Sequence, residues 1–307
     1  MDFLYMLESL RMPVLNEFMQ AITLLGEETA FLAVALIVFW CVDKKRGYLL
    51  MSVGFMGTML NQFLKLWFRI PRPWVLDPNF TILESAREAA AGYSFPSGHT
   101  TLAVGTYGAM AATSKKGWNR LLFVILALLV GFSRMYLGVH TPADVLVGAL
   151  TSVVLILFLY PFAIAQSEKP MKVILALMIA ASIGLLAFVQ LYPFPADVDV
   201  SNLTSGSKNA YTMIGCMAGV AIVYAVDIRY LDFNTHAKWW AQVLKAVLGL
   251  ALVIAVKELL RAPLDTLFAG HMAARAVRYF LIVITAGIIW PMTFGWFSRL
   301  GRKVKIK

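Results

Sequence analysis

The chain has 307 residues, of which 60% are hydrophobic and only 14% are charged, and its mean hydropathy is +0.74. A soluble protein of this length cannot bury so much apolar surface, so the composition excludes an ordinary soluble domain and indicates a polytopic membrane protein. The formal charge of +10 does not indicate nucleic acid, because the basic residues stand mainly in short segments between apolar runs, where membrane topology explains them.

The first 25 residues predict an amphipathic helix that lies in the membrane interface. Phe3, Leu4, Leu7 and Leu10 recur at three- and four-residue spacing among polar residues. No cleavable signal peptide is expected, because no basic start followed by an apolar core is found there.

Nine apolar segments follow. The first, Thr29–Val42, is short for a hydrocarbon core of roughly 30 Å, and the shortest of the others can cross only if they are packed inside a bundle. We place the other eight near residues 47–66, 99–114, 118–133, 143–165, 171–192, 210–226, 239–259 and 277–297. The predicted fold class is an all-α polytopic membrane helical bundle of about nine transmembrane helices plus the N-terminal interfacial helix. Residues 193–209 are expected to form a polar loop.

Charge asymmetry predicts which side of the membrane each loop faces. Lysine and arginine are concentrated near residues 43–46, 115–120, 168–172, 227–238 and 299–307. The positive-inside rule puts these loops and the C-terminus in the cytoplasm. The opposite loops then face the extracytoplasmic side.

Three polar clusters interrupt the apolar sequence on that opposite side. They are Lys65 to Pro73, Pro96-Ser97-Gly98-His99, and Ser133 to Asp144. The first cluster ends one apolar segment, the second begins the next, and the third joins the two that follow. We therefore expect all three clusters to meet at one membrane surface.

The basic residues of the clusters suit a phosphate ester. Lys65, Arg72 and Arg134 supply positive charge for the oxygens around phosphorus, where phosphoryl transfer needs it. Arginine adds planar hydrogen bonding to two oxygens at once.

The second cluster predicts a helix start that binds an anion. Ser97 is a plausible N-cap, and Gly98 lets the backbone approach a ligand closely. The free N–H groups of a helix start favour negative charge, and His99 at that position is a candidate to protonate a leaving alkoxide.

His140 and Asp144 stand four residues apart, so the carboxylate can fix the orientation of the imidazole. An imidazole so oriented can attack phosphorus and form a phosphohistidine that water hydrolyses. Pro142 predicts that a helix starts near Thr141–Pro142, with Asp144 in its first turn. No carboxylate cluster indicates a metal, so we predict metal-independent chemistry without a cofactor.

The spacing Lys-x6-Arg-Pro, Pro-Ser-Gly-His and Ser-Arg-x5-His-x3-Asp resembles the three motifs of the type-2 phosphatidic acid phosphatase superfamily, which comprises membrane lipid phosphatases. Every motif position is present: Lys65, Arg72, Pro73, Pro96, Ser97, Gly98, His99, Ser133, Arg134, His140 and Asp144. Soluble vanadium haloperoxidases share these motifs, but the apolar segments argue against that branch.

The resemblance implies a role for each residue. His140 is expected to be the nucleophile, Asp144 the residue that orients it and His99 the general acid. Phosphate binding is expected from Lys65, Arg72, Ser97, Gly98 and Arg134. Residues 1–166 are similar to the family core with its active site, and residues 167–307 are predicted to be an additional C-terminal transmembrane helical module.

The sequence therefore predicts an integral membrane phosphatase that hydrolyses a lipid phosphate or diphosphate at the extracytoplasmic face. Phosphatidate, phosphatidylglycerol phosphate, an isoprenyl diphosphate and a sphingoid-base phosphate are all candidate substrates. Two alternatives stay open, a lipid phosphotransferase that uses an acceptor other than water, and a lipid binder or transporter without catalysis. Outer residues are further candidates for a headgroup pocket, although solvated loop residues are the more common interpretation: Arg87, Glu88, His271, Arg275 and Arg278.

Overall fold

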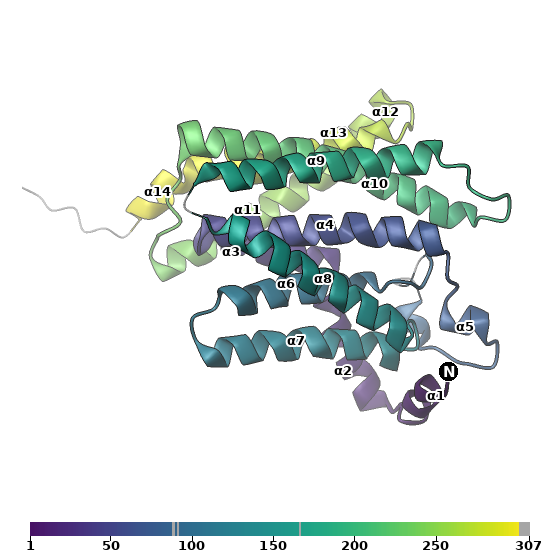
Figure 1. Cartoon of the computed structure of the whole chain (residues 1–307). Helices are drawn as coiled ribbons and strands as arrows, with labels where there is room; N and C mark the ends of the chain where they lie inside the picture. The colour runs from purple at the N-terminus through teal and green to yellow at the C-terminus, as the bar shows by residue number, and fades with distance from the viewer. Residues whose placement is uncertain (88–89, 91, 166, 301–307) are drawn as a thin grey trace, which may run out of the picture.

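The computed structural model describes residues 1–87, 90, 92–165 and 167–300, and within these the regular structure is entirely helical (Figure 1). The α-helices are α1 (Asp2–Ser9), α2 (Pro13–Leu24), α3 (Glu28–Cys41), α4 (Lys44–Phe68), α5 (Pro73–Leu76), α6 (Gly98–Thr113), α7 (Gly117–Tyr136), α8 (Pro142–Ala163), α9 (Glu168–Leu191), α10 (Val200–Val226), α11 (Trp239–Leu259), α12 (Arg261–Leu267), α13 (Ala273–Ile284) and α14 (Phe294–Arg299). Short 3-10 turns occur at Glu84–Ala86 and Pro291–Thr293, and π-helical turns at Asp227–Leu231 and Thr285–Ile289.

Helix α4 runs through the middle of the bundle. Figure 1 shows α9 and α10 along one side of it and α6, α7 and α8 toward the other side. Successive long helices reverse direction, so α4 and α7 end, and α6, α8 and α10 begin, at the same end of the bundle. This arrangement brings the three polar clusters to one end, and α14 lies at the opposite end.

The number of candidate membrane spans is lower than the expected nine. Among the described residues, five helical stretches are long and apolar enough to cross, and α2 with α3, bent by 51°, makes a sixth if the pair crosses as one. The five are Gly117–Tyr136, Pro142–Ala163, Glu168–Leu191, Val200–Leu231 and Ala273–Arg299. About nine spans is therefore not confirmed, although the all-helical membrane class fits. The expected spans near 47–66, 99–114 and 239–259 correspond to α4, α6 and α11, which fall outside this set.

The N-terminal region contains two helices where one was expected. Met12 is extended and Pro13 occupies the first position of α2, where the N–H that proline lacks would have no partner within the helix. The buried face of α1 contacts protein, because Leu4 packs with Phe80 and Ile82 of the segment after α5.

The expected loop at 193–209 is also partly helical. Asp199 caps α10, and its carboxylate accepts hydrogen bonds from the backbone N–H groups of Ser201 and Asn202 at 2.7 and 3.2 Å. An aspartate at this position satisfies the free donors of a helix start, so α10 begins ten residues before the apolar run from 210 that predicted it. Its first turns are polar and lie at the same end as the three clusters.

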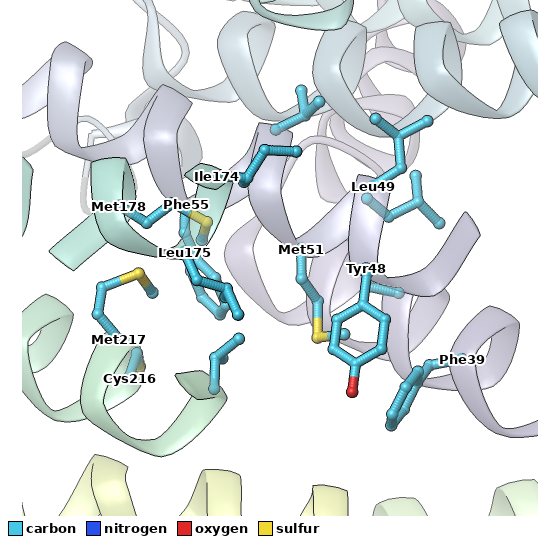
Figure 2. Packing of buried hydrophobic residues seen from close by; sticks show 14 of the residues in the cluster. Phe39, Tyr48, Leu49, Met51, Phe55, Ile174, Leu175, Met178, Cys216 and Met217 are labelled. Atoms are coloured by element: carbon cyan, nitrogen blue, oxygen red, sulfur yellow. The ribbon is translucent and has the colours of Figure 1, made fainter. Parts of the chain in front are cut away.

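One hydrophobic cluster joins both parts of the chain. Figure 2 shows Phe55 of α4 near Leu175 and Met178 of α9, with Cys216 and Met217 of α10 beside them. Because these side chains come from both sides of residue 166, α9 and α10 share their packing with α4. Close helix contacts of this kind supply much of the attraction between helices in a membrane.

Helices α10 and α13 approach each other even more closely. A Cβ atom at Gly215 would lie 2.0 Å from the carbonyl oxygen of Ala276, so only glycine permits this separation. The contact fixes the start of α13 against α10, near the end of the bundle that holds the polar clusters.

Candidate active site

The start of α8 organises the third cluster. Thr141 is the N-cap, and Asp144 at the third helical position completes a capping box. The carboxylate Oδ2 of Asp144 accepts a hydrogen bond from the Thr141 backbone N–H at 2.7 Å. The predicted helix start at Thr141–Pro142, with Asp144 in the first turn, is confirmed.

The same carboxylate oxygen reaches His140. Oδ2 of Asp144 lies 3.4 Å from His140 Nδ1 and accepts a hydrogen bond from the Ser94 hydroxyl at 2.5 Å. Both Asp144 and His140 are almost fully buried, with 1% and 2% of their surface exposed. The carboxylate is therefore held by the backbone and by Ser94 in a position from which it orients the imidazole.

Arg72 contacts the other side of the ring. Its Nη1 lies 2.9 Å from His140 Nε2 and donates to the Val139 carbonyl at 2.8 Å, while its Nε donates to the Gly92 carbonyl at 2.9 Å. A guanidinium can only donate, so His140 Nε2 must accept, and the ring proton is assigned to Nδ1, facing Asp144. This tautomer places the basic electron pair of the ring on Nε2, where it accepts the hydrogen bond from Arg72.

The surroundings of His140 favour its neutral form. Burial lowers the pKa of His140 well below its ordinary value of 6.5, and the nearby Arg72 cation lowers it further. Burial also lowers the pKa of Arg72 to about 10, which leaves the guanidinium charged at neutral pH. The site thus holds a neutral imidazole against a permanent cation.

The second cluster forms the start of α6. Ser97 is its N-cap, as predicted, and accepts hydrogen bonds from the backbone N–H and the hydroxyl of Thr100 at 3.4 and 2.9 Å. The Ser97 N–H donates to the backbone carbonyl of Asp144 at 3.0 Å, which joins the second cluster to the third. A Cβ on Gly98 would lie 3.4 Å from the side-chain oxygen of Asn61 on α4, so α6 starts close to that helix.

Several buried side-chain nitrogens in the site have no hydrogen-bond partner in the described part of the protein. Arg134 is fully buried, and its Nη1 donates to the Thr23 hydroxyl at 2.8 Å, but its Nε and Nη2 are unpaired, as is Nε2 of His99. Leaving such groups unpaired costs roughly 1–3 kcal/mol each, and more when they are charged. An anionic ligand with several acceptor oxygens would satisfy them.

Two cavities open next to these residues. One, of about 540 Å³, is lined by Lys65, Gly98 and His99, and the other, of about 580 Å³, is lined by Arg72. Gly92 and Tyr93 line both, and Lys65 donates a hydrogen bond to the Tyr93 carbonyl. The structure therefore brings together all eight residues expected in the site, with His140, Asp144 and Arg134 buried behind the cavities.

Three residues that contact the predicted site residues were not predicted from the sequence. Ser94 holds Asp144, Thr23 on α2 holds Arg134, and Asn61 donates to the Pro96 carbonyl at 3.1 Å. Asn61 carried a usable signal, because a polar residue four positions before Lys65 lies on the same face of α4.

The candidate residues for a headgroup pocket have different surroundings in the structure. Arg87 is paired with Glu84, and Arg278 is buried, whereas Arg275 lines the cavity that contains Lys65. Glu88 lies outside the described residues. In the described ranges, no three side chains of His, Cys, Asp or Glu gather in a way that could hold a metal ion.

Family comparisons agree with the arrangement of the motifs. Residues 46–168 match the PAP2 superfamily, and residues 211–303 match the transmembrane extension of PAP2 superfamily phosphatases. Undecaprenyl-diphosphatase BcrC of Bacillus subtilis is 36% identical to this chain over 152 residues, which cover 47% of this chain and 75% of the relative. The chain belongs to the PAP2 superfamily.

Other PAP2 relatives are named for different lipid substrates. Phosphatidylglycerophosphatase B of Bacillus subtilis is 34% identical over 152 residues, or 45% of this chain and 70% of the relative. A probable sphingosine-1-phosphate phosphatase of Dictyostelium discoideum is 31% identical over 165 residues, or 49% of this chain and 39% of the relative. No solved structure matches this PAP2 protein.

Proposed function

We propose that this protein hydrolyses a lipid phosphate or diphosphate through a phosphohistidine, without a metal ion. Membership of the PAP2 superfamily and the named relatives support a membrane lipid phosphatase of the PAP2 type. The observation that carries the mechanism is the chain of contacts from Asp144 through His140 to Arg72, which leaves the ring electron pair on Nε2.

In the first step, a phosphoryl oxygen replaces His140 Nε2 as the acceptor from Arg72 Nη1, so that the electron pair of Nε2 is released. Nε2 then attacks phosphorus, and the bond from phosphorus to the leaving oxygen breaks. The electron pair of that bond goes to the leaving oxygen, which takes a proton from His99. Arg72 and Arg134 stabilise the charge on the phosphoryl oxygens, with Lys65 and the Ser97–Gly98 helix start. Asp144 stabilises the positive charge that the ring gains as the bond from Nε2 to phosphorus forms.

In the second step, a water molecule attacks phosphorus and the bond to Nε2 breaks. His99, now neutral, accepts a proton from the attacking water, and orthophosphate leaves. A phosphotransferase would use the same phosphohistidine with another acceptor in place of water.

The lipid tail would stay in the bilayer while the phosphate reaches the site from the side. The relatives named for an undecaprenyl diphosphate, a phosphatidylglycerophosphate and a sphingosine phosphate support this range of candidate substrates. The concentration of cations in the loops at the other end of the bundle supports an extracytoplasmic site and a cytoplasmic C-terminus. We also propose that residues 1–166 form the core and residues 167–307 an added module.

A panel of lipid phosphates and diphosphates tests this function directly. We expect the purified protein in detergent to release orthophosphate from at least one lipid, at the same rate with and without EDTA. Loss of activity in EDTA, restored by a divalent cation, would contradict the metal-independent mechanism. Product that appears only when an alcohol acceptor is added would identify a phosphotransferase, and lipid binding without release would support a binder.

The pH profile tests the state of the nucleophile. We expect kcat/KM to be maintained as pH falls through 6.5, because burial lowers the pKa of His140 and the cations Arg72, Arg134 and Lys65, together with His99, reinforce that effect. A lower pKa means that the neutral, attacking form persists to lower pH.

Removing one of these cations should move the profile in a known direction. In Arg72→Gln the pKa of His140 should rise, so the residual kcat/KM of the variant relative to wild type should fall as pH is lowered. Titration of the substrate is common to both proteins and cancels in this ratio. A ratio that is independent of pH would show that Arg72 does not control the ionisation of His140.

A further inference from the structure

The C-terminal extension forms one wall of the cavity that contains Lys65 and His99. Helix α10 and the start of α13 contribute this wall with five polar residues, Asn202, Ser205, Lys208, Asn209 and Arg275. None of these belongs to the three motifs, and all lie after residue 166. The cavity is therefore bounded by the catalytic core on one side and by the added module on the other.

The polar residues follow one face of α10. Asn202, Ser205, Lys208 or Asn209, and Thr212 recur every three or four positions, so they lie above one another along the helix. Residues at intermediate positions are buried in the bundle, among them Gly206, Ala210, Met213 and Met217. A polar face turned toward a cavity, on a helix apolar enough to span a membrane, is typical of a ligand pathway or binding site.

Two residues of this wall have informative contacts: Arg275 is held by its neighbours, and Asn202 has an unpaired side-chain oxygen. Arg275 Nε donates to the Thr212 hydroxyl at 3.4 Å, and its guanidinium stacks 5.8 Å from the centre of the Tyr279 ring. The side-chain oxygen of Asn202 is buried without a hydrogen-bond partner in the described ranges. The wall thus presents a positioned cation, Arg275, and beside it a buried amide oxygen that can only accept a hydrogen bond.

Charge is distributed unevenly in this cavity. Lys208 and Arg275 stand on the wall formed by the extension, and Lys65 stands on α4. The carboxylates that line the cavity, Glu27 and Glu28, stand at the start of α3. Glu28 is near enough to Arg275 to interact with it electrostatically, but the side formed by α10 and α13 carries two cations and therefore attracts an anion, beyond the cations already assigned to the phosphate that is cleaved.

The position of His99 shows which part of a substrate would face this wall. His99 protonates the leaving oxygen in the proposed mechanism, and it lines this cavity, whereas His140 is buried and does not line it. The leaving group must therefore occupy the cavity. In a lipid diphosphate the leaving group is itself a phosphate, which gains negative charge when the bond between the bridging oxygen and the attacked phosphorus breaks.

We propose that Lys208 and Arg275, with the side-chain NH₂ group of Asn209, form a second anion subsite that binds the leaving phosphate of a lipid diphosphate. This inference rests on the proposed function and assigns a purpose to the C-terminal extension. The bridging oxygen keeps the electron pair of the broken bond, and the extension stabilises that charge. A lipid monophosphate, whose leaving group is an uncharged alcohol, gains nothing from the subsite.

Binding of inorganic anions tests the subsite without any lipid. We expect the wild-type protein in detergent to bind pyrophosphate more tightly than orthophosphate, as measured by calorimetry. Lys208→Gln, and the double variant with Arg275→Gln, should weaken pyrophosphate binding by about ten- to a hundredfold, because each loses a charged hydrogen-bond donor, and should leave orthophosphate binding unchanged. Lys169→Gln, which removes an exposed lysine at the opposite end of the bundle, is the matched control and should change neither.

A lipid pair then tests the consequence for turnover. The two lipids are a prenyl diphosphate and the prenyl monophosphate with the same chain. The kcat/KM for the diphosphate divided by that for the monophosphate should be lower in the double variant than in wild type, by the same factor by which the variant weakens pyrophosphate binding. An equal loss for both lipids, or wild-type protein that binds pyrophosphate no better than orthophosphate, would overturn the subsite. If no lipid released phosphate, the proposed activity would be refuted, and the anion binding would still decide the subsite.

Discussion

Replacement of His140 by alanine should abolish turnover and leave the helical bundle intact. In the proposed mechanism His140 Nε2 carries the electron pair that attacks phosphorus. The backbone carbonyls of Val139 and Gly92, which also accept from Arg72, cannot replace it. Loss of a nucleophile that acts in a unit with its partners costs on the order of 10⁴- to 10⁶-fold in kcat. We expect phosphate release from every lipid in the panel to fall at least to the lower end of this range.

Trapping of the intermediate makes this test specific. With a substrate labelled on the terminal phosphate, an alkaline quench during turnover should leave label on the wild-type protein, because a phosphohistidine survives alkali and is lost in acid. The label should be absent from His140→Ala. His236→Ala is the matched control, since His236 is exposed in the loop before α11, at the end of the bundle away from the site.

The integrity of the variant must be measured together with its activity. The imidazole is buried between Asp144 and Arg72, so its loss leaves a small cavity and removes one contact of a buried guanidinium. His140→Gln fills more of that space and should be equally inactive. Full turnover by either variant, with an unchanged elution profile in detergent, would refute the assignment of the nucleophile.

The local parts of the site could be predicted because their signals are local. A serine before an apolar run predicted the cap of α6, and a threonine followed by proline predicted the start of α8. These signals act within one turn of helix, so they fix where Ser97 and Asp144 lie relative to their own backbones. The spacing of four between His140 and Asp144 then sufficed to predict their contact.

The contacts that depend on tertiary packing could not be predicted. Thr23 supports Arg134 from a helix more than a hundred positions earlier, and it is a single threonine in an apolar stretch with nothing to mark it. Ser94 was closer to a motif, but its contact with Asp144 depends on the path of the chain before α6. Such pairs become visible only when the elements are packed.

The number of candidate spans and the role of the C-terminal extension also could not be predicted from the sequence, because both depend on which helix faces are turned inward. Hydropathy counted α4, α6 and α11 as spans, yet α6 has only 16 residues and α4 carries polar residues near its end. From the sequence, the polar first turns of α10 predict a loop, because a helix that faces a cavity lacks the uniform apolar pattern of a lipid-facing span. The same polarity that obscured the helix is the basis of the proposed subsite.

Asp144→Asn should lower kcat by up to about 10⁴-fold, as the loss of the charge that supports a catalytic imidazole does elsewhere. When Nε2 forms its bond to phosphorus, the ring becomes cationic while its proton stays on Nδ1, 3.4 Å from the carboxylate. An amide in the same place carries no charge to stabilise that cation. If the amide turns its NH₂ group toward the ring, Nδ1 must accept, and the electron pair needed for attack is lost from Nε2.

Asp144 is also part of the cap of α8, so two different substitutions at this position can distinguish its structural role from its catalytic role. The amide oxygen of asparagine can still accept from the Thr141 N–H and the Ser94 hydroxyl, so Asp144→Asn should retain most of the helix cap, whereas Asp144→Ala should lose it at a cost of about 0.5–2 kcal/mol. Both variants should lose turnover, and only the alanine variant should also lose thermal stability. Asp43→Asn makes the same change at the cap of α4, where Asp43 accepts from the Arg46 N–H at 2.9 Å at the other end of the bundle, and should leave kcat unchanged. If Asp144→Asn kept full activity, Asp144 would be a helix cap alone, and His140 would have to be oriented by Arg72 and the Val139 backbone without help from the carboxylate.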